Sequence, residues 1–415
     1  MPDKSKMTAV EIFDILFDKD TVNEVYAGYG NANAAHGYVN GSPAVSVVMD
    51  GVMDFATSEK ICNALDFAAK NGIPVISVYN SVGAPIEEGA GVFGYYGNVL
   101  KKVSEISGVV PQIAVTEGVC TGSLAVIAAS ADILIATKSA EIYAVTGSDT
   151  SLDDSVAIIT DDLKSALEMI VSLIEKLPSN NLGKIPEYEA DAPEAVPTAD
   201  STLEGLAEKD SLISLYDGFG TASKTAFATI GGALVGFISA EKGLLECEDC
   251  SKIAKFVNLC DAYSIPIVTV LDTEGLSENA CLNAVVKLTA AYTNATTRKI
   301  TLITGKAYGT ALSVFISGNA DAVYAFENAV IAPLPPLTAA EFLYHDKLKG
   351  AKDLTAKRNE IAAEYEASMS AGNAMKTGLI TAVITPKTAY KTIASALEIS
   401  QGKRPANFFD RKHSI

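Results

Sequence analysis

Two glycine turns of the form G-x-x-x-G are the features of this sequence that could do chemistry. The first runs from Gly118 to Gly122 and the second from Gly305 to Gly309. Each follows a short apolar run and precedes a stretch of small residues, which predicts a strand, a sharp turn and a helix. The N–H groups that open such a helix have no partner within it and carry partial positive charge, so two of them could stabilise a developing oxyanion. A glycine required only for tight strand–helix packing is the alternative interpretation.

Other candidates for catalysis or metal binding are weaker. Cys247 and Cys250 have C-x-x-C spacing, but neither a second such pair nor a nearby histidine accompanies them, so we expect no metal site. Glu87 and Glu88 follow a predicted strand and could act as acid and base, although a solvated loop is the simpler interpretation. Neither glycine turn has the spacing G-x-x-x-x-G-K-[ST] of a phosphate-binding loop.

The composition narrows the classes of function. The chain has 415 residues, 48% of them apolar and 20% charged, which is enough for large buried cores and predicts two to three domains. Its formal net charge of −18 disfavours nucleic acid as a partner. The first residues do not resemble a signal peptide, and the longest apolar stretch, residues 123–136, is too short to span a membrane. The six cysteines are scattered, which predicts reduced thiols in a cytoplasmic protein.

The elements that would position the turns occur twice, because the chain contains an internal repeat. The segment around Lys60 matches the segment around Lys252 at an offset of 192 residues, and the two glycine turns match at an offset of 187. Small changes of offset are what loops of different length produce. We therefore predict two domains, residues 1–185 and 206–415, joined by a polar linker at 186–205.

Each copy alternates apolar strands with helices. Residues 57–71 have apolar side chains at helical spacing, and Asn71-Gly72 predicts the end of that helix. Near-continuous apolar strands separated by helices are typical of an α/β layered fold. The other predicted elements are strands at 44–48, 75–78, 113–115, 133–135, 233–238, 267–271, 300–303 and 322–324, and helices at 122–131, 251–264, 309–318, 338–349, 353–369 and 389–400.

Four segments, in the same order along the chain, carry a family resemblance. Residues 81–89 (SVGAPIEEG) are similar to the pattern S-G-G-A-R-[ILM]-x-E-G, and residues 107–113 (SGVVPQI) to S-G-V-I-P-Q-I. The first glycine turn is similar to G-P-C-A-G-G-A, and residues 306–311 (KAYGTA) to K-A-Y-G-G-A. The chain therefore resembles the carboxyltransferase component of biotin-dependent acyl-CoA carboxylases and of the related sodium-pump decarboxylases.

The resemblance implies two tandem crotonase-like domains per chain, each a β-β-α spiral. It implies that the first domain binds an acyl-CoA thioester, that the second binds biotin arriving on a separate carrier protein, and that no metal takes part. The active site would form where the first domain of one subunit meets the second domain of another, in a homo-oligomer built from dimers that can extend to a hexamer. A biotin carboxylase or a membrane decarboxylase subunit would be a further partner.

The resemblance also implies which residues form the site. Backbone amides of Gly122 and Ser123 would stabilise the thioester enolate. Those of Gly309, Thr310 and Ala311 would bind the ureido oxygen of biotin. Ser123 and Thr310 stand where the family has glycine, but a main-chain donor does not depend on its side chain. The further substrate-binding positions are Ser81, Gly83, Ala84, Gly118, Cys120, Lys306 and Tyr308.

Two departures from the family pattern leave alternatives open. Pro85 replaces the family's arginine near the acyl-CoA, and residues 272–276 (DTEGL) replace the family's D-V-P-G-F-x-x-G loop near the biotin. The leading hypothesis is a subunit that moves a carboxyl group between acyl-CoA and biotin. The alternatives are a catalytically silent paralogue that assembles with an active carboxylase, and a crotonase-type acyl-CoA enzyme that works without biotin.

Overall fold

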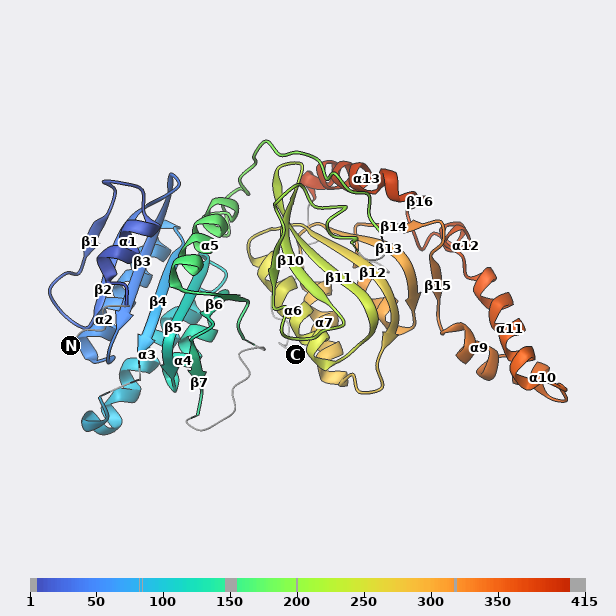
Figure 1. Ribbon diagram of the computed structural model, residues 1–415, viewed down its shortest axis with the longest axis horizontal. Coiled ribbons are helices and arrows are strands. Elements are labelled where there is room, and N and C mark those ends of the chain that lie inside the picture. Colours follow the sequence, from blue (N-terminus) through green and yellow to red (C-terminus); the bar gives the residue numbers. More distant parts are fainter. Residues whose placement is uncertain are drawn as a thin grey trace. The chain divides into compact units, whose positions relative to one another are not determined.

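The computed structural model describes residues 6–81, 83, 85–145, 155–198, 201–316 and 319–403. The chain divides into two compact units, one ending at Pro186 and the other beginning at Glu187 (Figure 1). Each unit contains one mixed eight-stranded sheet, and the two sheets share the same strand order. This identity of topology confirms the predicted α/β class and the internal duplication.

In the first unit the strand order is β1-β2-β3-β4-β5-β6-β8, and β7 pairs with the end of β5. The pairs β1–β2 and β2–β3 are antiparallel, and all later neighbours are parallel. The strands are β1 (Asn23–Val25), β2 (Ala32–Val39), β3 (Ser42–Asp50), β4 (Val75–Ser81), β5 (Gln112–Thr121), β6 (Ile133–Thr137), β7 (Glu141–Tyr143) and β8 (Ile158–Thr160). The helices are α1 (Ala9–Leu16), α2 (Phe55–Asn71), the 3-10 helix η1 (Ile86–Gly91), α3 (Val92–Glu105), α4 (Ser123–Ala129) and α5 (Leu163–Lys176).

The second unit repeats this plan in the order β9-β10-β11-β12-β13-β14-β16, with β15 pairing with the end of β13. Its strands are β9 (Ile213–Leu215), β10 (Lys224–Ile230), β11 (Ala233–Leu245), β12 (Ile267–Leu276), β13 (Lys299–Tyr308), β14 (Ala322–Phe326), β15 (Val330–Ala332) and β16 (Ala382–Ile384). Its helices are α6 (Cys247–Ala262), α7 (Leu282–Asn294), α8 (Thr310–Phe315), α9 (Pro336–Phe342), α10 (His345–Leu348), α11 (Leu354–Ser368), α12 (Ala371–Lys376), α13 (Pro386–Ile399) and the 3-10 helix η2 (Ser400–Gly402).

Helix α2 illustrates how the sequence specifies these elements. Its Ile61 and Leu65 are fully buried in the core that α2, α3 and α4 share with the first sheet, and each such side chain stabilises the fold by about 1.5–3 kcal/mol. At its start the Asp54 carboxylate accepts a hydrogen bond from the Thr57 N–H at 2.8 Å. At its end Gly72 adopts φ 63°, so the predicted stop is confirmed.

Some predicted elements differ from those in the structure. The predicted helix 338–349 is wrong, because Tyr344 leaves the helical conformation (φ −117°, ψ 23°) and separates α9 from α10. The predicted helix 309–318 is too long, since α8 ends at Phe315. Strands β2 and β10 and helices α3, α5 and α7 have no counterpart among the predicted elements.

The segment that follows the first unit runs along the second sheet. Glu187 forms an antiparallel bridge with Ala233, and the Tyr188 N–H donates to the Gly232 carbonyl at 3.0 Å. Further along, the Lys209 N–H donates back to the Asp191 carbonyl at 3.4 Å. These backbone hydrogen bonds attach the beginning of the segment to the second unit.

The expectation of six free thiols is wrong for two cysteines. Cys247, the first residue of α6, forms a disulfide with Cys281, the residue before α7, and their Cα atoms are 5.4 Å apart. Helices α6 and α7 pack against each other, which brings together two residues that are 34 positions apart. Cys250, the other half of the C-x-x-C sequence, is fully buried and free. Among the described residues, no group of three or more His, Cys, Asp or Glu is arranged to hold a metal ion.

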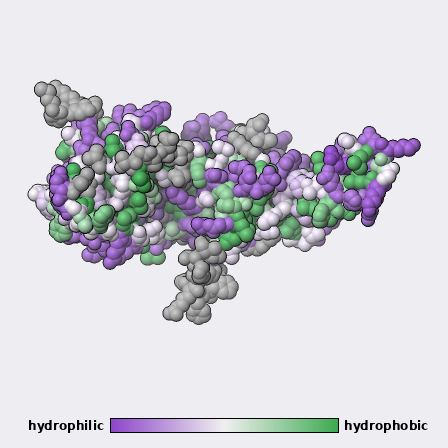
Figure 2. Space-filling model, turned by 90° about the horizontal axis from the view of Figure 1, so that it is seen from below, coloured by the Kyte–Doolittle hydropathy of each residue, from purple (hydrophilic) through white to green (hydrophobic). Residues whose placement is uncertain are grey.

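Helices α9, α10 and α11 form a helical arm on the second unit (Figure 1). Figure 2 shows hydrophilic and hydrophobic residues mixed on the surface of this arm, where Phe342 is 78% exposed. No helix in the described ranges is both long and apolar enough to cross a membrane. A cavity of about 410 Å³ lies within the arm and is lined by Glu341, His345, Leu348, Lys349, Leu354, Thr355 and Arg358.

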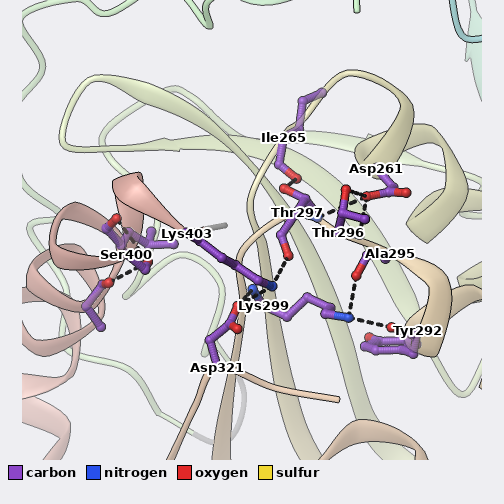
Figure 3. Close-up of polar contacts among 12 residues, drawn as sticks. Asp261, Ile265, Tyr292, Ala295, Thr296, Thr297, Lys299, Asp321, Ser400 and Lys403 are labelled. Carbon is purple, nitrogen blue, oxygen red and sulfur yellow. Dashed lines mark hydrogen bonds and ion pairs between the residues drawn. The ribbon is translucent and has the colours of Figure 1, made fainter. Parts of the chain in front are cut away.

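Polar contacts around the buried Lys299 anchor the start of β13 (Figure 3). The Lys299 ammonium donates to the carbonyl oxygens of Tyr292 and Ala295 where α7 ends, the latter at 2.7 Å. Burial lowers the pKa of Lys299 to about 8. The Asp321 carboxylate accepts from the Lys299 N–H at 2.8 Å and forms an ion pair with Lys403 at 2.9 Å. These contacts fix one end of the strand that carries the second glycine turn at its other end.

Candidate functional site

Each glycine turn begins within a bulge of its strand. Between Tyr79 and Ser81, β4 advances by two residues while its partner β5 advances by four. Between Leu271 and Thr273, β12 advances by two residues while β13 advances by four. Extra residues of this kind bend a strand and change the direction of its remaining residues. The two bulges therefore aim the last residues of β5 and β13 in matching directions within their own units.

Gly122 and Gly309 adopt a conformation that other residues rarely adopt. Gly122 has φ 62° and ψ −134°, and Gly309 has φ 66° and ψ −146°. The Gly122 N–H donates to the Tyr143 carbonyl at 2.7 Å, and the Gly309 N–H donates to the Ala332 carbonyl at 3.1 Å. Both amides thus belong to the pairing with β7 and β15. The two glycines supply the shape of the turn, and their own N–H groups are engaged.

The donors available to a ligand are the next amides along the chain. Within the described ranges, the N–H groups of Ser123, Thr310 and Ala311 have no hydrogen-bond acceptor. Ser123 and Thr310 are the first residues of α4 and α8, so their N–H groups lie at the positive ends of those helices. Ser123 is half-buried and Thr310 is exposed, while the Ala311 side chain is buried.

The loop after β4 lies beside the first turn. The Gly83 N–H donates to the Ser81 hydroxyl at 3.1 Å, and Gly83 adopts φ 116°. A Cβ on Gly83 would lie 3.6 Å from the Thr121 hydroxyl, so this loop and the turn are in contact. Cys120 is fully buried, and burial raises the pKa of its thiol to about 12, which keeps it from acting as a nucleophile. Ala84 lies outside the described residues.

The loop after β12 has the same construction. The Gly275 N–H donates to the Thr273 hydroxyl at 3.1 Å, and Gly275 adopts φ 113°. A Cβ on Gly275 would lie 3.0 Å from the Tyr308 carbonyl, directly before the second turn. Thr273 and Gly275 are not among the site residues predicted from the sequence. The repeat could have found them, because Ser81 and Gly83 lie at the same offset of 192 residues.

The two predicted side chains before the second turn have different surroundings. Lys306 is exposed, and its ammonium pairs with the Glu274 carboxylate at 2.6 Å, which raises the pKa of Lys306. The Lys306 N–H donates to Asp272 at 2.7 Å. Tyr308 is 2% exposed and packs with Tyr365, so its side chain belongs to the core and only its backbone borders the turn.

The predicted positions thus fall into two groups, one in each unit. The first gathers where β4 and β5 end and contains Ser81, Gly83, Gly118, Cys120, Gly122 and Ser123. The second gathers where β13 ends and contains Lys306, Tyr308, Gly309, Thr310 and Ala311. Each group offers main-chain N–H donors, which suits the binding of an oxygen that carries negative charge.

Comparison with known proteins relates both groups to one family. The model of the family described as the carboxyl transferase domain matches residues 4–152 and 155–415. The chain is 29% identical to the propionyl-CoA carboxylase carboxyltransferase subunit of Haloferax mediterranei, over 99% of this chain and 93% of that protein. It is also 29% identical to the methylmalonyl-CoA decarboxylase subunit alpha of Propionigenium modestum, over 96% of this chain and 91% of that protein.

A solved structure shares the whole fold. The crystal structure of transcarboxylase 12S, described as a hexamer assembly with hydrolysed methylmalonyl-coenzyme A bound, superposes with a TM-score of 0.90 at 26% identity. The match covers 99% of this chain and 92% of that one. The duplicated sheet is therefore an architecture that also occurs in a protein with a coenzyme A ligand.

Proposed function

The chain belongs to the carboxyl transferase domain family, as a carboxyltransferase subunit of the biotin-dependent acyl-CoA carboxylases and decarboxylases, and from this premise we propose that its main-chain amides perform the transfer. The first unit would bind an acyl-CoA thioester and the second would bind biotin on a separate carrier protein. The observation that carries the proposal is the pair of matched turns, each followed by helix-opening N–H groups that have no acceptor in the described part of the chain.

In the first unit, Ser123 is the proposed donor. Breaking the bond between the α-carbon and the carboxyl carbon of a malonyl-type thioester leaves an electron pair that delocalises onto the thioester oxygen as an enolate. The Ser123 N–H would donate to that oxygen, and the positive end of α4 would favour its charge. Removal of one such donor from an oxyanion site typically costs a factor of about 10²–10³ in kcat.

In the second unit, Thr310 and Ala311 are the proposed donors. Carrier-bound biotin supplies a ureido nitrogen that takes up the released carboxyl group, and the proton that this nitrogen gives up replaces the carboxyl group on the α-carbon of the thioester. The N–H groups of Thr310 and Ala311 fit the neighbouring ureido oxygen, since an oxygen of this kind accepts two hydrogen bonds and neither amide has an acceptor within the described ranges. The exposed Thr310 leaves the approach to this turn open to a macromolecular carrier.

The chain's place in the cell is part of the same proposal. Named relatives are subunits of propionyl-CoA carboxylase and methylmalonyl-CoA decarboxylase, and transcarboxylase 12S is described as a hexamer assembly. We therefore expect a cytoplasmic homo-oligomer that receives biotin on a carrier protein and works with a biotin carboxylase or a membrane decarboxylase subunit. Neither proposed step requires a metal.

One observation favours a second candidate, a catalytically silent paralogue. The Gly122 and Gly309 amides donate to β7 and β15, so each turn offers fewer donors than we predicted from the sequence. Pro85 stands where the family pattern has an arginine near the acyl-CoA. A chain with weakened substrate contacts could still assemble with an active carboxylase.

The deciding experiment follows the conversion of methylmalonyl-CoA by the purified chain. We expect propionyl-CoA to accumulate only when free biotin is added as the carboxyl acceptor, as measured by separation of the two CoA esters. Binding of methylmalonyl-CoA without conversion would support the silent paralogue. Conversion that is independent of biotin would instead indicate a crotonase-type enzyme.

A further inference from the structure

The first glycine of each turn faces a polar side chain from the neighbouring strand. A Cβ on Gly118 would lie 2.9 Å from the side-chain amide of Asn80 on β4. A Cβ on Gly305 would collide with the carboxylate of Asp272 on β12. The close approach of these side chains explains why glycine occupies both positions.

Each of these side chains hydrogen-bonds to the backbone of the bulge. The Asp272 carboxylate accepts from the Lys306 N–H at 2.7 Å, inside the extra residues of β13. The Asn80 amide, in the orientation that satisfies both of its polar atoms, donates to the Glu117 carbonyl at 3.1 Å, inside the extra residues of β5. The bulge removes these two backbone groups from the hydrogen bonds between the strands, and the side chains give each of them a hydrogen-bond partner again.

The same device therefore exists twice with opposite polarity. Asn80 and Asp272 are 192 residues apart, the offset that also relates Ser81 to Thr273. In the first unit an amide binds a carbonyl, and in the second unit a carboxylate binds an N–H. The two units keep a polar side chain at this position although one is an amide and the other a carboxylate. This indicates that both turns require a side chain that fills the bulge.

We propose that Asn80 and Asp272 are positioning residues, each of which fills the bulge beside its glycine turn and so holds the oxyanion donors of its own unit in place. The inference rests on the proposed function, because it assigns Asn80 to the acyl-CoA turn and Asp272 to the biotin turn. The proposed donor Thr310 lies four positions after Lys306, the partner of Asp272, and the paired β15 holds the stretch between them. A displaced bulge would therefore displace the donor.

The first test is kinetic and uses the full chain with methylmalonyl-CoA and free biotin. We expect Asp272→Ala to lower kcat/KM for biotin by roughly tenfold or more, while the affinity for methylmalonyl-CoA measured by calorimetry stays unchanged. Asn80→Ala is expected to lower the affinity for methylmalonyl-CoA and to leave KM for biotin unchanged. Asp272→Asn keeps an oxygen acceptor for the Lys306 N–H and should restore most of the loss.

A matched control separates positioning from general destabilisation. The Asp261 carboxylate also accepts backbone N–H groups, from Thr296 at 2.6 Å and Thr297 at 3.0 Å, but at the opposite end of β13 (Figure 3). Asp261→Ala should reduce stability in urea without a selective effect on biotin. If Asp272→Ala reduced kcat/KM for biotin and the affinity for methylmalonyl-CoA equally, as a merely structural loss would, the proposal would be overturned.

The second test does not depend on activity. Hydrogen exchange followed by mass spectrometry should show faster exchange in peptides covering residues 304–311 of Asp272→Ala, by roughly tenfold, with the rest of the second unit unchanged. The Asp261→Ala control should leave these peptides unaffected. If the wild-type chain transferred no carboxyl group, the proposed function would fail, and the exchange result alone would decide whether Asp272 holds the turn. Unchanged exchange in Asp272→Ala would refute the positioning role in either case.

Discussion

Gly122 and Gly309 donate their N–H groups to β7 and β15, while among the residues that the structure describes the next N–H groups along the chain have no acceptor. At the scale of single residues, two neighbouring residues of each turn thus have different tasks: one sets the backbone conformation and the other supplies the hydrogen-bond donor. The glycine provides a left-handed φ, and the next residue provides the donor. This division explains how Ser123 and Thr310 could act where the family pattern has glycine, because only their backbone is required.

Replacing Ser123 with proline tests the donor directly. Proline lacks the N–H but is well tolerated at the first position of a helix, which Ser123 occupies. We expect Ser123→Pro to lower kcat for biotin-dependent conversion of methylmalonyl-CoA by about 10²–10³ with little change in thermal stability. Ser123→Gly retains the N–H and should keep most activity. A Ser123→Pro enzyme as active as Ser123→Gly would contradict the assignment.

Replacing Gly305 with alanine tests the close approach of Asp272. The new Cβ collides with the carboxylate, and overpacking of this kind costs about 1–3 kcal/mol of unfolding free energy, measured in urea. Combining Gly305→Ala with Asp272→Ala should recover part of that loss, since the colliding group is gone. Gly94→Ala is the control, because its Cβ would meet nothing within 4 Å in a helix. Strictly additive effects of the two variants would argue against the collision.

At the scale of elements, the two copies use different residues for one task. Gln112 begins β5 and donates to the Val103 carbonyl in the last turn of α3 at 3.0 Å. Lys299 begins β13 and donates to the Ala295 carbonyl just after α7. In both units a buried donor satisfies carbonyl groups that a helix leaves unpaired where it ends. The second unit does so with a buried charge, and this makes its stability depend on pH.

Lys299→Gln should remove part of that pH dependence. The pKa of Lys299 is about 8 in the folded chain, and an unfolded lysine titrates near its usual value of about 10.4. Between these values the unfolded state binds more protons, so the stability of the wild type rises with pH by at most about 1.4 kcal/mol per pH unit from this group. Below pH 8 both states are protonated and this contribution is flat.

The measurement compares urea unfolding of the wild type and Lys299→Gln at several pH values between 7 and 10. The difference in unfolding free energy should change in favour of the wild type as the pH rises above about 8. Glutamine keeps an N–H donor, as Gln112 does in the first unit, so the variant should remain folded. A difference that is constant with pH would show that Lys299 does not titrate in this window.

At the scale of the whole molecule, the proposed reaction needs both units, because each unit is proposed to bind only one of the two substrates. The resemblance implies that a site combines the first unit of one subunit with the second unit of another. Duplication followed by divergence of the two copies would produce such a division of tasks.

Mixing two inactive variants tests this arrangement. Ser123→Pro damages the first unit and Thr310→Pro damages the second. If sites form between the subunits of a dimer, each mixed dimer contains one intact site, and random reassociation should restore about one quarter of the wild-type activity. A mixture of Ser123→Pro with a second first-unit variant should restore none. Absence of rescue in both mixtures would place the site within one chain.

The sequence by itself determined the duplication, the α/β class and the position of both glycine turns. These features depend on local patterns: an apolar period, a helix stop such as Gly72, and a repeated spacing. Helix α3 escaped prediction because Gly94 and Gly97 lower its intrinsic helix propensity, and the burial of Val99 and Val103 in the core that α3 shares with α2 and α4 compensates for them.

Tertiary structure alone decided which amides of each turn are free. β7 lies about twenty residues beyond the Gly122 turn, and β15 about as far beyond Gly309, so no local pattern shows that these strands take up the glycine N–H groups. The Cys247–Cys281 disulfide and the Asp272–Lys306 hydrogen bond likewise join residues far apart in the chain. Pairing across such distances depends on how the elements pack. A local pattern cannot show it, because the partner leaves no trace in the apolar periodicity of the segment that it contacts.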